Sequence, residues 1–428
     1  MKRHHIVYSN DQLFPSTETD TQQIMHTVSA LGRLARVTLA LPTPRVGAAP
    51  DLAALCRHYE VEPSFELRLV PNPLFVEATP RGTERSPGGL PTRLGALRRL
   101  VEKMAHTVAW RRDPAWRAAD WLHTRNLWTA LAFLETTTLP VLYETYRPWP
   151  HQISAAAPLF RRLVSHPRFL GLVSHSAYNG RLWQRHAGLT RDRLLVAHNG
   201  IDTRKFAPLA PPEEARTRLR AAPEPALEEA LRRGLRLDAK STIVGYLGHI
   251  SEGKGIGFVL RLAAQLPELT FLLVGATKES DAIRHQARGT PNVAVLPWQI
   301  SNDMRREYLQ ASDILMIPPS ARALEAVGNT VLPIKIFEYL AAGRTIFAGR
   351  TDDLVEVLRD DENSCLVPPD DLAIATRALS LLAADEPRRR RLARAAAIES
   401  AGYSLDERAR RILEFARGRL PARGGEEL

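Results

Sequence analysis

Short apolar runs alternate with helix-length segments through the first half of the chain. The runs are HIVYS, RVTLALP, FELRLVP, WLHTR, PVLYET, GLVSH and LLVAH, between residues 5 and 198. Runs this short, rich in β-branched and aromatic residues, are typical of buried strands, and most are separated by enough residues for a helix. The pattern therefore predicts a parallel sheet with helices on both faces.

A second series of the same kind lies further along the chain. Its runs are TIVGYLG, LTFLLVG, NVAVLP, DILMIPP, TIFAG and SCLVPP, between residues 242 and 369. The pattern predicts two doubly wound, Rossmann-like α/β domains facing a cleft. The domain ranges are 1–203 and 241–405, with an inter-domain linker carrying one inserted helix at 204–240 and a final helix at 406–428 that could pack back on the first domain.

Composition indicates a globular protein of a reducing compartment. Hydrophobic residues make up 44% and charged residues 25% of the 428 residues. No apolar run approaches the roughly 18 residues of a membrane span, and the start MKRHHIVYSNDQ lacks the apolar core of an export signal. Cys56 and Cys365 lie far apart, so neither a disulfide framework nor a zinc site is predicted. We expect a cytoplasmic protein.

The net charge predicts an anionic partner. At +11 the chain favours a phosphorylated substrate, an acidic membrane surface or nucleic acid. The loops after the strands are where a ligand is expected, because ligands of open parallel sheets bind beyond the carboxyl ends of the strands.

One such loop is GYLGHISEGKG, residues 245–255. Its glycines let the backbone approach an anion, and Lys254 stands where the next helix should begin. The loop therefore suits a diphosphate, although a glycine-rich turn with a solvated lysine is the alternative. It contains neither GK[ST] nor GxGxxG, which argues against a Walker loop and against nicotinamide binding.

The stretch LPIKIFEYLAAG, residues 332–343, predicts a short apolar helix that starts at Pro333 and ends at Gly343. Lys335 and Glu338 are three residues apart, so an exposed ion pair between them is one interpretation. Since the helix follows a strand of the second series, its start should lie at the same edge as Lys254. We then expect Glu338 to accept hydrogen bonds from ribose hydroxyls and Lys335 to neutralise phosphate.

Backbone amides complete this predicted donor corner. Those of Thr330 to Leu332 are expected to face phosphate oxygens, because they lie at the start of the same helix.

Polar residues also follow strands of the first domain. Thr17 and Asp20 in SNDQLFPSTETDTQQ either bind sugar hydroxyls or cap the next helix, and for Asp20 the cap is favoured. Glu144 in YETYRPW is a candidate for orienting or deprotonating an acceptor hydroxyl. The alternative for Glu144 is a loop salt bridge to Arg147 or Arg125.

Several of these segments together resemble a known family. GYLGHISEGKG, NTVLPIKIFEYLAAG and DDLVEVLRDDENSCLVPP resemble the donor-binding domain of GT-B retaining glycosyltransferases, in particular glycosyltransferase family 4. HNGIDTRKF resembles the segment leading into the hinge of that family, and LHTRN with PVLYETY resembles its first domain more loosely.

The resemblance implies roles for individual residues. Lys254 matches the family lysine on the nucleotide diphosphate, and Glu338 matches the glutamate on the nucleotide ribose. Three positions depart from the family: His249 often is arginine, Thr330 often is a second glutamate, and Tyr146 often is histidine. On this basis Glu144 and Lys254 are the catalytic candidates.

The residues predicted to bind the two substrates form two sets. The donor set is His249, Lys254, Thr330, Leu332, Lys335 and Glu338, and the acceptor set is Thr17, Asp20 and Tyr146.

The resemblance also implies the reaction. A hexose would pass from a UDP- or GDP-sugar to a polysaccharide, lipid-linked or small-molecule acceptor, with retention of configuration and with no metal or other cofactor. The departing phosphate itself would help to deprotonate the incoming hydroxyl. A nucleotide-sugar epimerase on the same fold is one alternative. A non-enzymatic protein binding anions or nucleic acid is the other, although it leaves the phosphate corner unexplained.

A basic stretch in the first domain suggests a further partner. Residues 92–121, TRLGALRRLVEKMAHTVAWRRDPAWRAADW, mix Leu, Trp and Arg at roughly helical spacing. Such a helix could lie on an anionic membrane that presents a lipid-linked acceptor, which would make the protein peripheral on the inner face of the membrane. The alternative is a solvated basic face over an ordinary core helix.

Overall fold

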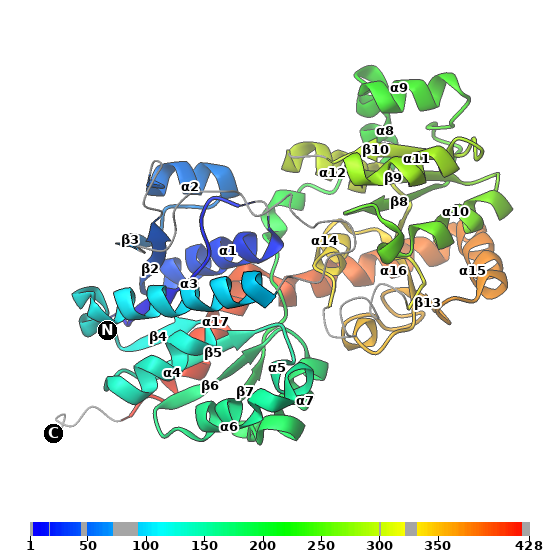
Figure 1. The fold of residues 1–428 in the computed structure, drawn as a ribbon. Coiled ribbons are helices and arrows are strands. Elements are labelled where there is room, and N and C mark those ends of the chain that lie inside the picture. The colour runs from blue at the N-terminus through cyan, green and yellow to red at the C-terminus, as the bar shows by residue number, and fades with distance from the viewer. Residues whose placement is uncertain are drawn as a thin grey trace. The chain divides into compact units, whose positions relative to one another are not determined.

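The computed structural model describes residues 3–16, 18–43, 49–71, 93–298, 301–321 and 332–421. The chain forms two compact units (Figure 1). Unit 1 comprises Met1–Gly200 with Leu405–Leu428, and unit 2 comprises Ile201–Ser404. Each holds one parallel sheet with helices packed against it, so the predicted α/β class with two Rossmann-like domains is confirmed.

The sheet of unit 1 has seven strands, all paired in parallel, in the order β3-β2-β1-β4-β5-β6-β7. The order reverses between β1 and β4, so loops that follow these two strands diverge to opposite sides there. The strands are β1 (His5–Ser9), β2 (Arg36–Thr43), β3 (Glu66–Pro71), β4 (Trp121–Thr124), β5 (Val141–Thr145), β6 (Phe169–Ser174) and β7 (Leu194–Val196).

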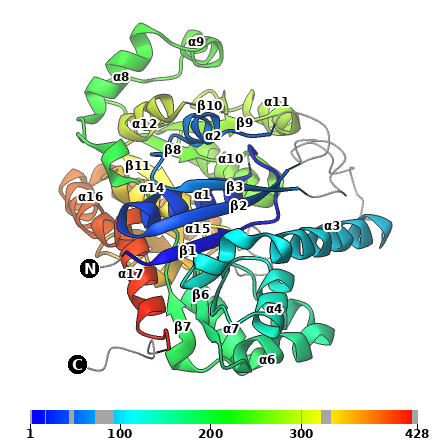
Figure 2. The ribbon, with the colours of Figure 1, turned by 90° about the vertical axis from the view of Figure 1, so that its left-hand side faces the viewer.

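Helices cover both faces of this sheet (Figure 2), which is why its strands are apolar on both sides. Ile6 and Tyr8 of β1 join one core, whereas Val7 between them joins the other. The helices are α1 (Thr19–Leu34), α2 (Leu52–Tyr59), α3 (Arg93–Arg112), α4 (Leu127–Thr136), α5 (Trp149–Gln152), α6 (Ala157–Ser165), α7 (Ala177–Ala187) and α17 (Leu405–Arg417).

The sheet of unit 2 has six parallel strands in the order β10-β9-β8-β11-β12-β13, again with a reversal beside the first strand of the series. Ile243 and Leu247 of β8 face one core, whereas Val244 and Tyr246 face the other. The strands are β8 (Ile243–Leu247), β9 (Thr270–Ala276), β10 (Val293–Pro297), β11 (Ile314–Met316), β12 (Thr345–Gly349) and β13 (Cys365–Val367).

The segment predicted to carry one inserted helix holds two. Both α8 and α9 pack on unit 2, because Ala215, Leu219, Leu227 and Ala230 are buried in its core. The helices of unit 2 are α8 (Pro212–Ala221), α9 (Pro225–Arg232), α10 (Ile256–Gln265), α11 (Asp281–Ala287), α12 (Asn302–Ala311), α14 (Lys335–Ala341), α15 (Leu372–Ala384) and α16 (Glu386–Ser400).

The last helix returns to unit 1. Leu405, Ala409, Ile412 and Ala416 of α17 are buried in the same core as Ile24 and Val28 of α1 and the neighbouring strands. Their spacing puts these four residues on one stripe of the helix. The opposite ends of the chain therefore build one core, and α17 carries polar side chains to the strand ends of unit 1.

Candidate functional site

The glycine-rich corner of unit 2 follows β8. Gly248 has a φ of 143°, and a side chain there would put its Cβ 2.6 Å from Nζ of Lys335. Gly275, at the end of β9, has a φ of 131°, and its Cβ would lie 2.0 Å from the carbonyl oxygen of Gly248. The backbone contact at Gly275 and the positive φ at both positions therefore require glycine.

The corner continues into a helix start. A short 3₁₀ turn at Glu252–Lys254 is followed by Gly255 in a left-handed conformation (φ 75°), and α10 begins at the next residue. By contrast, a Cβ on Gly253 would meet nothing within 4 Å. The predicted glycines therefore do different work, since Gly248 and Gly255 shape the turn and Gly253 faces open space.

Lys335 is the first residue of α14, two positions after Pro333, so this helix starts later than predicted. Its ammonium lies 3.9 Å from the centre of the Tyr246 ring. In the part of the chain that the structure describes, no hydrogen bond or ion pair of Lys335 is recorded, and the exposed pair with Glu338 does not form. Burial, then the charges of Lys254 and Arg305, lower the pKa of Lys335 to about 7.

Glu338 pairs instead with Arg305 of α12. One guanidinium nitrogen, Nη2, lies 2.6 Å from Oε1 and 2.7 Å from Oε2 of Glu338. The Arg305 guanidinium also lies 5.8 Å from the ring centre of the exposed Trp298. A carboxylate offers about four lone-pair sites, so Glu338 keeps acceptor capacity for another donor such as a hydroxyl.

Sequence reasoning missed Arg305. It stands in NDMRREYL, where nothing distinguishes it from the adjacent Arg306. Only the packing of α12 beside α14 selects it.

The other predicted residues of unit 2 have separate surroundings. Lys254 is exposed, and its charge acts on Lys335. His249 Nε2 lies 3.6 Å from Oε2 of Glu279. Leu332 is buried in the core of unit 2. Thr330 lies outside the described residues.

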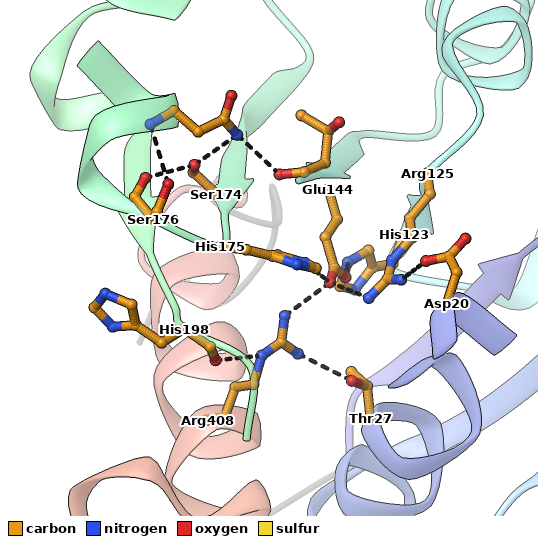
Figure 3. A network of polar contacts seen from close by, with 12 residues as sticks. Asp20, Thr27, His123, Arg125, Glu144, Ser174, His175, Ser176, His198 and Arg408 are labelled. Carbon is orange, nitrogen blue, oxygen red and sulfur yellow. Dashed lines mark hydrogen bonds and ion pairs between the residues drawn. The ribbon is translucent and has the colours of Figure 1, made fainter. Parts of the chain in front are cut away.

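A second polar cluster lies at the strand ends of unit 1, around Glu144 of β5 (Figure 3). The Glu144 carboxylate is fully buried. Arg125, just after β4, donates from Nη2 to Oε1 at 2.6 Å. Arg408 of α17 donates to the same oxygen at 2.7 Å. The predicted pair with Arg125 thus forms, as part of a larger network.

Imidazole and phenol groups complete this network. His175 Nε2 lies 2.8 Å from Oε1 of Glu144, and His123 Nε2 lies 2.8 Å from Oε2. Tyr8 donates its hydroxyl to Oε2 at 3.2 Å. These side chains come from β1, β4 and the residue after β6, so the parallel register brings them to one edge.

Arg408 connects α17 to the strand ends of unit 1 through hydrogen bonds. Besides Glu144, it donates to the carbonyl oxygen of His198 and to Oγ1 of Thr27, each at 3.0 Å. Sequence reasoning missed this residue, because its partner Glu144 is 264 positions earlier in the chain.

The electrostatics of the network keep Glu144 ionised. Burial alone raises its pKa, but Arg125 and Arg408 outweigh burial and hold the pKa well below its usual range. Burial lowers the pKa of His175 to about 4, despite the opposing effect of Glu144. A carboxylate with these partners is a weak base, so the geometry favours a positioning role for Glu144. Its predicted action on an acceptor hydroxyl stays a prediction.

The acceptor-side candidates lie around this cluster. Asp20 lies in the first turn of α1, pairs with Arg125, and accepts from Gln12 Nε2 at 2.7 Å. The helix is preceded by Glu18 without a side-chain cap, so the favoured capping role of Asp20 is wrong. The Tyr146 ring centre lies 6.0 Å from that of His175. Thr17 lies outside the described residues.

Neither a metal-binding cluster nor a membrane-spanning helix is present in the described ranges. There, no group of three or more His, Cys, Asp or Glu side chains could hold a metal ion. Likewise, none of the helices described is long and apolar enough to cross a membrane.

Comparison with known sequences finds a family match within unit 2. Residues 241–385 match the family model "Glycosyl transferases group 1". A D-inositol 3-phosphate glycosyltransferase of Xylanimonas cellulosilytica is 28% identical over 248 residues, which is 55% of this chain and 54% of that protein. An alpha-galactosylglucosyldiacylglycerol synthase of Streptococcus pneumoniae is 26% identical over 40% of this chain and 41% of its own. The chain thus spans about half the length of these relatives, or less.

Comparison with solved structures extends over both units. A sucrose-phosphate synthase of Thermosynechococcus elongatus superposes with a TM-score of 0.71 at 14% identity, covering 97% of this chain and 99% of that one. Anabaena HepE, solved in complex with UDP-glucose, gives a TM-score of 0.63 at 15% identity, with the same coverage of 97% and 99%. These similarities show the GT-B fold.

Proposed function

We propose that the chain is a glycosyltransferase that takes its sugar from a nucleotide-sugar donor, as the match of residues 241–385 to the glycosyl transferases group 1 model supports. The observation that carries the proposal is the corner of unit 2, where the charges of Lys254 and Arg305 act on Lys335 and Arg305 pairs with the Glu338 carboxylate. This excess of positive charge, next to backbone that only glycine allows, suits a nucleoside diphosphate.

Each residue of the corner has a role in this proposal. Lys335 and Lys254 stabilise the diphosphate as negative charge grows on it when the sugar leaves. Glu338 accepts hydrogen bonds from the ribose, in the orientation that Arg305 fixes. Among the described residues, the half-buried Lys335 ammonium lies against the Tyr246 ring and makes no ion pair, so a phosphate oxygen would give it a direct anionic partner.

The donor is proposed to be a UDP- or GDP-sugar. HepE was solved with UDP-glucose, which makes UDP the first nucleotide to test. The acceptor is proposed to be a hydroxyl group of a glycan, a lipid-linked sugar or a small molecule. Two relatives act, by their names, on an inositol phosphate and in the synthesis of a glycosylated diacylglycerol, so both a soluble and a lipid acceptor have support.

Unit 1 is proposed to contact the acceptor through Asp20 and Tyr146. Glu144 would act by positioning, because an ionised carboxylate beside His175 Nε2 keeps the proton on that nitrogen. The other ring nitrogen, Nδ1, is then a hydrogen-bond acceptor at neutral pH. A non-enzymatic binding protein leaves the match to a glycosyltransferase family unexplained, and neither it nor an epimerase is favoured.

Transfer is proposed to proceed with retention of configuration and without a metal. If so, the anomeric coupling in the proton NMR spectrum of the first product matches that of the donor, and transfer continues in excess EDTA. An inverted coupling, or activity that returns only with added divalent cation, would reject the respective part of the proposal.

The donor site is tested by calorimetric titration of the protein with UDP and with GDP. We expect one nucleotide to bind, and Lys335→Ala and Glu338→Ala each to weaken it by about 10- to 100-fold, as for loss of a charge-assisted contact. Lys278→Ala is the matched control, since Lys278 is an exposed lysine of the same unit. Binding that both variants retain would remove the donor role of this corner.

A further inference from the structure

Part of helix α3 exposes apolar side chains and buries polar ones. Val101, Met104 and Val108 are 44%, 48% and 49% exposed. Their spacing of three and four residues puts them on one stripe of the helix. The face toward the protein holds Glu102, His106 and Thr107, exposed by 5%, 0% and 5%. A helix on a solvated surface has the opposite arrangement.

Specific contacts fix this rotation of α3. The hydroxyls of Thr107 and Thr129 are 2.9 Å apart, and Lys103 Nζ lies 3.1 Å from Oδ2 of Asp11. The fully buried Trp110 ring stacks against Phe133 at a centroid distance of 6.4 Å. Turning the helix to bury Val101, Met104 and Val108 would break all three contacts, so these side chains are held outward.

Around this stripe, acidic side chains are largely buried and two arginine side chains are exposed. Residues 92–121 contain seven basic and three acidic residues. The acidic side chains are turned inward: Glu102 is 5% exposed, Asp113 is 10% exposed and pairs with Arg68, and Asp120 is 13% exposed. Arg112 and Arg117, by contrast, are exposed.

We propose that this surface, the stripe of Val101, Met104 and Val108 with its basic flank, docks on an anionic lipid bilayer. An exposed apolar row beside exposed arginines is what an interfacial helix presents to acidic headgroups. Figure 2 shows α3 extending beyond the strands of unit 1. The structure thereby favours the membrane interpretation of residues 92–121 over a solvated basic face.

A second copy of the chain is a poorer occupant. A two-fold interface would place the same stripe against itself, and therefore the same basic flank against itself, on chains that each carry a net charge of +11. An anionic bilayer supplies the opposite charge. It would also hold the protein beside lipid-linked acceptors, but the docking does not depend on the proposed transfer reaction.

The test is flotation of the full chain with vesicles of phosphatidylcholine alone or with an equal share of phosphatidylglycerol, without donor or acceptor. We expect binding to the mixed vesicles, weakened at high salt because the Debye length falls to about 3 Å at 1 M. The variant V101S/M104S/V108S should bind at least about ten-fold more weakly, since it removes most of the apolar contact.

The control exchanges equally exposed apolar residues elsewhere. Ile374, Leu381 and Ile398 of unit 2 are 46%, 58% and 73% exposed, so I374S/L381S/I398S should bind mixed vesicles like the parent. Equal circular dichroism and unfolding midpoints establish that both variants fold.

Three results would overturn the inference: no binding of the parent to mixed vesicles, equal binding of the α3 variant, or a parent dimer in sedimentation that the α3 variant abolishes. Nucleotide binding by the same samples, measured by calorimetry, does not depend on any of these three results. A failure of docking therefore leaves the donor site standing, and a failure of nucleotide binding leaves the docking standing.

Discussion

Glu144 of unit 1 and Lys335 of unit 2 are both charged groups held away from bulk water, but their surroundings differ. Glu144 meets Arg125 and Arg408, and Asp20 balances the second charge of this pair of arginines. Lys335 meets the ring of Tyr246 and the charges of two further cations, with Glu338 already held by Arg305. We call the first cluster closed, because its two carboxylates balance its two guanidinium groups. We call the second cluster open, because its positive charges outnumber its negative charge.

The difference separates two kinds of buried charge. A closed network contributes to one fixed arrangement of the strand ends, and removing one member leaves an uncompensated charge among the buried groups. In an open cluster the like charges repel one another in the free protein, and a bound anion can offset this unfavourable free energy. This difference supports the proposed ligand binding by unit 2 and the proposed positioning role of the unit 1 network. Two substitutions and one change of pH test it.

The largest effect is expected for Glu144→Ala, because it leaves two buried guanidinium groups without their carboxylate. Removal of one partner from a buried ion pair typically costs about 3–5 kcal/mol of unfolding free energy. Chemical denaturation followed by circular dichroism measures this loss. Because the pKa of Glu144 is held below its usual range, the parent has this stabilisation above that range and loses it as the pH falls.

Glu135→Ala is the control for this experiment. Glu135 pairs with Arg162 on the surface at 2.6 Å, so its removal should leave the midpoint almost unchanged. If Glu144→Ala were as stable as Glu135→Ala, the network would not be the closed, stabilising cluster described above.

A smaller effect is expected for Gly248→Ala. The new Cβ would lie 2.6 Å from Nζ of Lys335, on backbone with a φ of 143°. Strained backbone of this kind costs about 1–3 kcal/mol, and displacement of Lys335 should weaken nucleotide binding as well. Denaturation and calorimetry measure the two consequences separately.

Gly253→Ala is the matched substitution in the same loop. A Cβ there meets nothing within 4 Å, so stability and nucleotide affinity should both be preserved. If Gly248→Ala and Gly253→Ala bound nucleotide equally well, the close approach of Lys335 to Gly248 would not matter for nucleotide binding.

The smallest effect is a pH dependence of nucleotide affinity. The pKa of Lys335 is about 7 in the free protein, where Lys254 and Arg305 oppose its charge and Glu338 favours it. A bound diphosphate raises this pKa, so binding takes up a proton above pH 7. Affinity should then fall as the pH rises from 7 to 9, by at most about ten-fold per pH unit.

Calorimetry across this range, with Lys335→Ala beside the parent, isolates the lysine. The nucleotide phosphate changes its protonation in the experiments with both proteins. Only the difference in pH dependence between parent and variant therefore comes from Lys335. A parent whose pH dependence equals that of the variant would show that Lys335 does not face the bound anion.

The fold could be predicted from the sequence because its signals are local. Each strand of both sheets lies in an apolar run of the sequence, and the break between the series lies where the chain enters unit 2. The corner of Gly248 and Lys254 was also visible, because glycines and a lysine in one loop need no distant partner to suggest a phosphate site. For the strands and the two-domain division, the pattern of apolar runs in the sequence was enough for the prediction.

Other features were decided only by tertiary packing. Arg305 and Arg408 carry no signal in their own segments, and each gains its role from a carboxylate that another strand or helix brings close. The apolar stripe of α3 points outward because contacts of Lys103, Thr107 and Trp110 fix the rotation of the helix. Sequence determines which faces a helix has, but the partners available inside the fold determine which of them is buried.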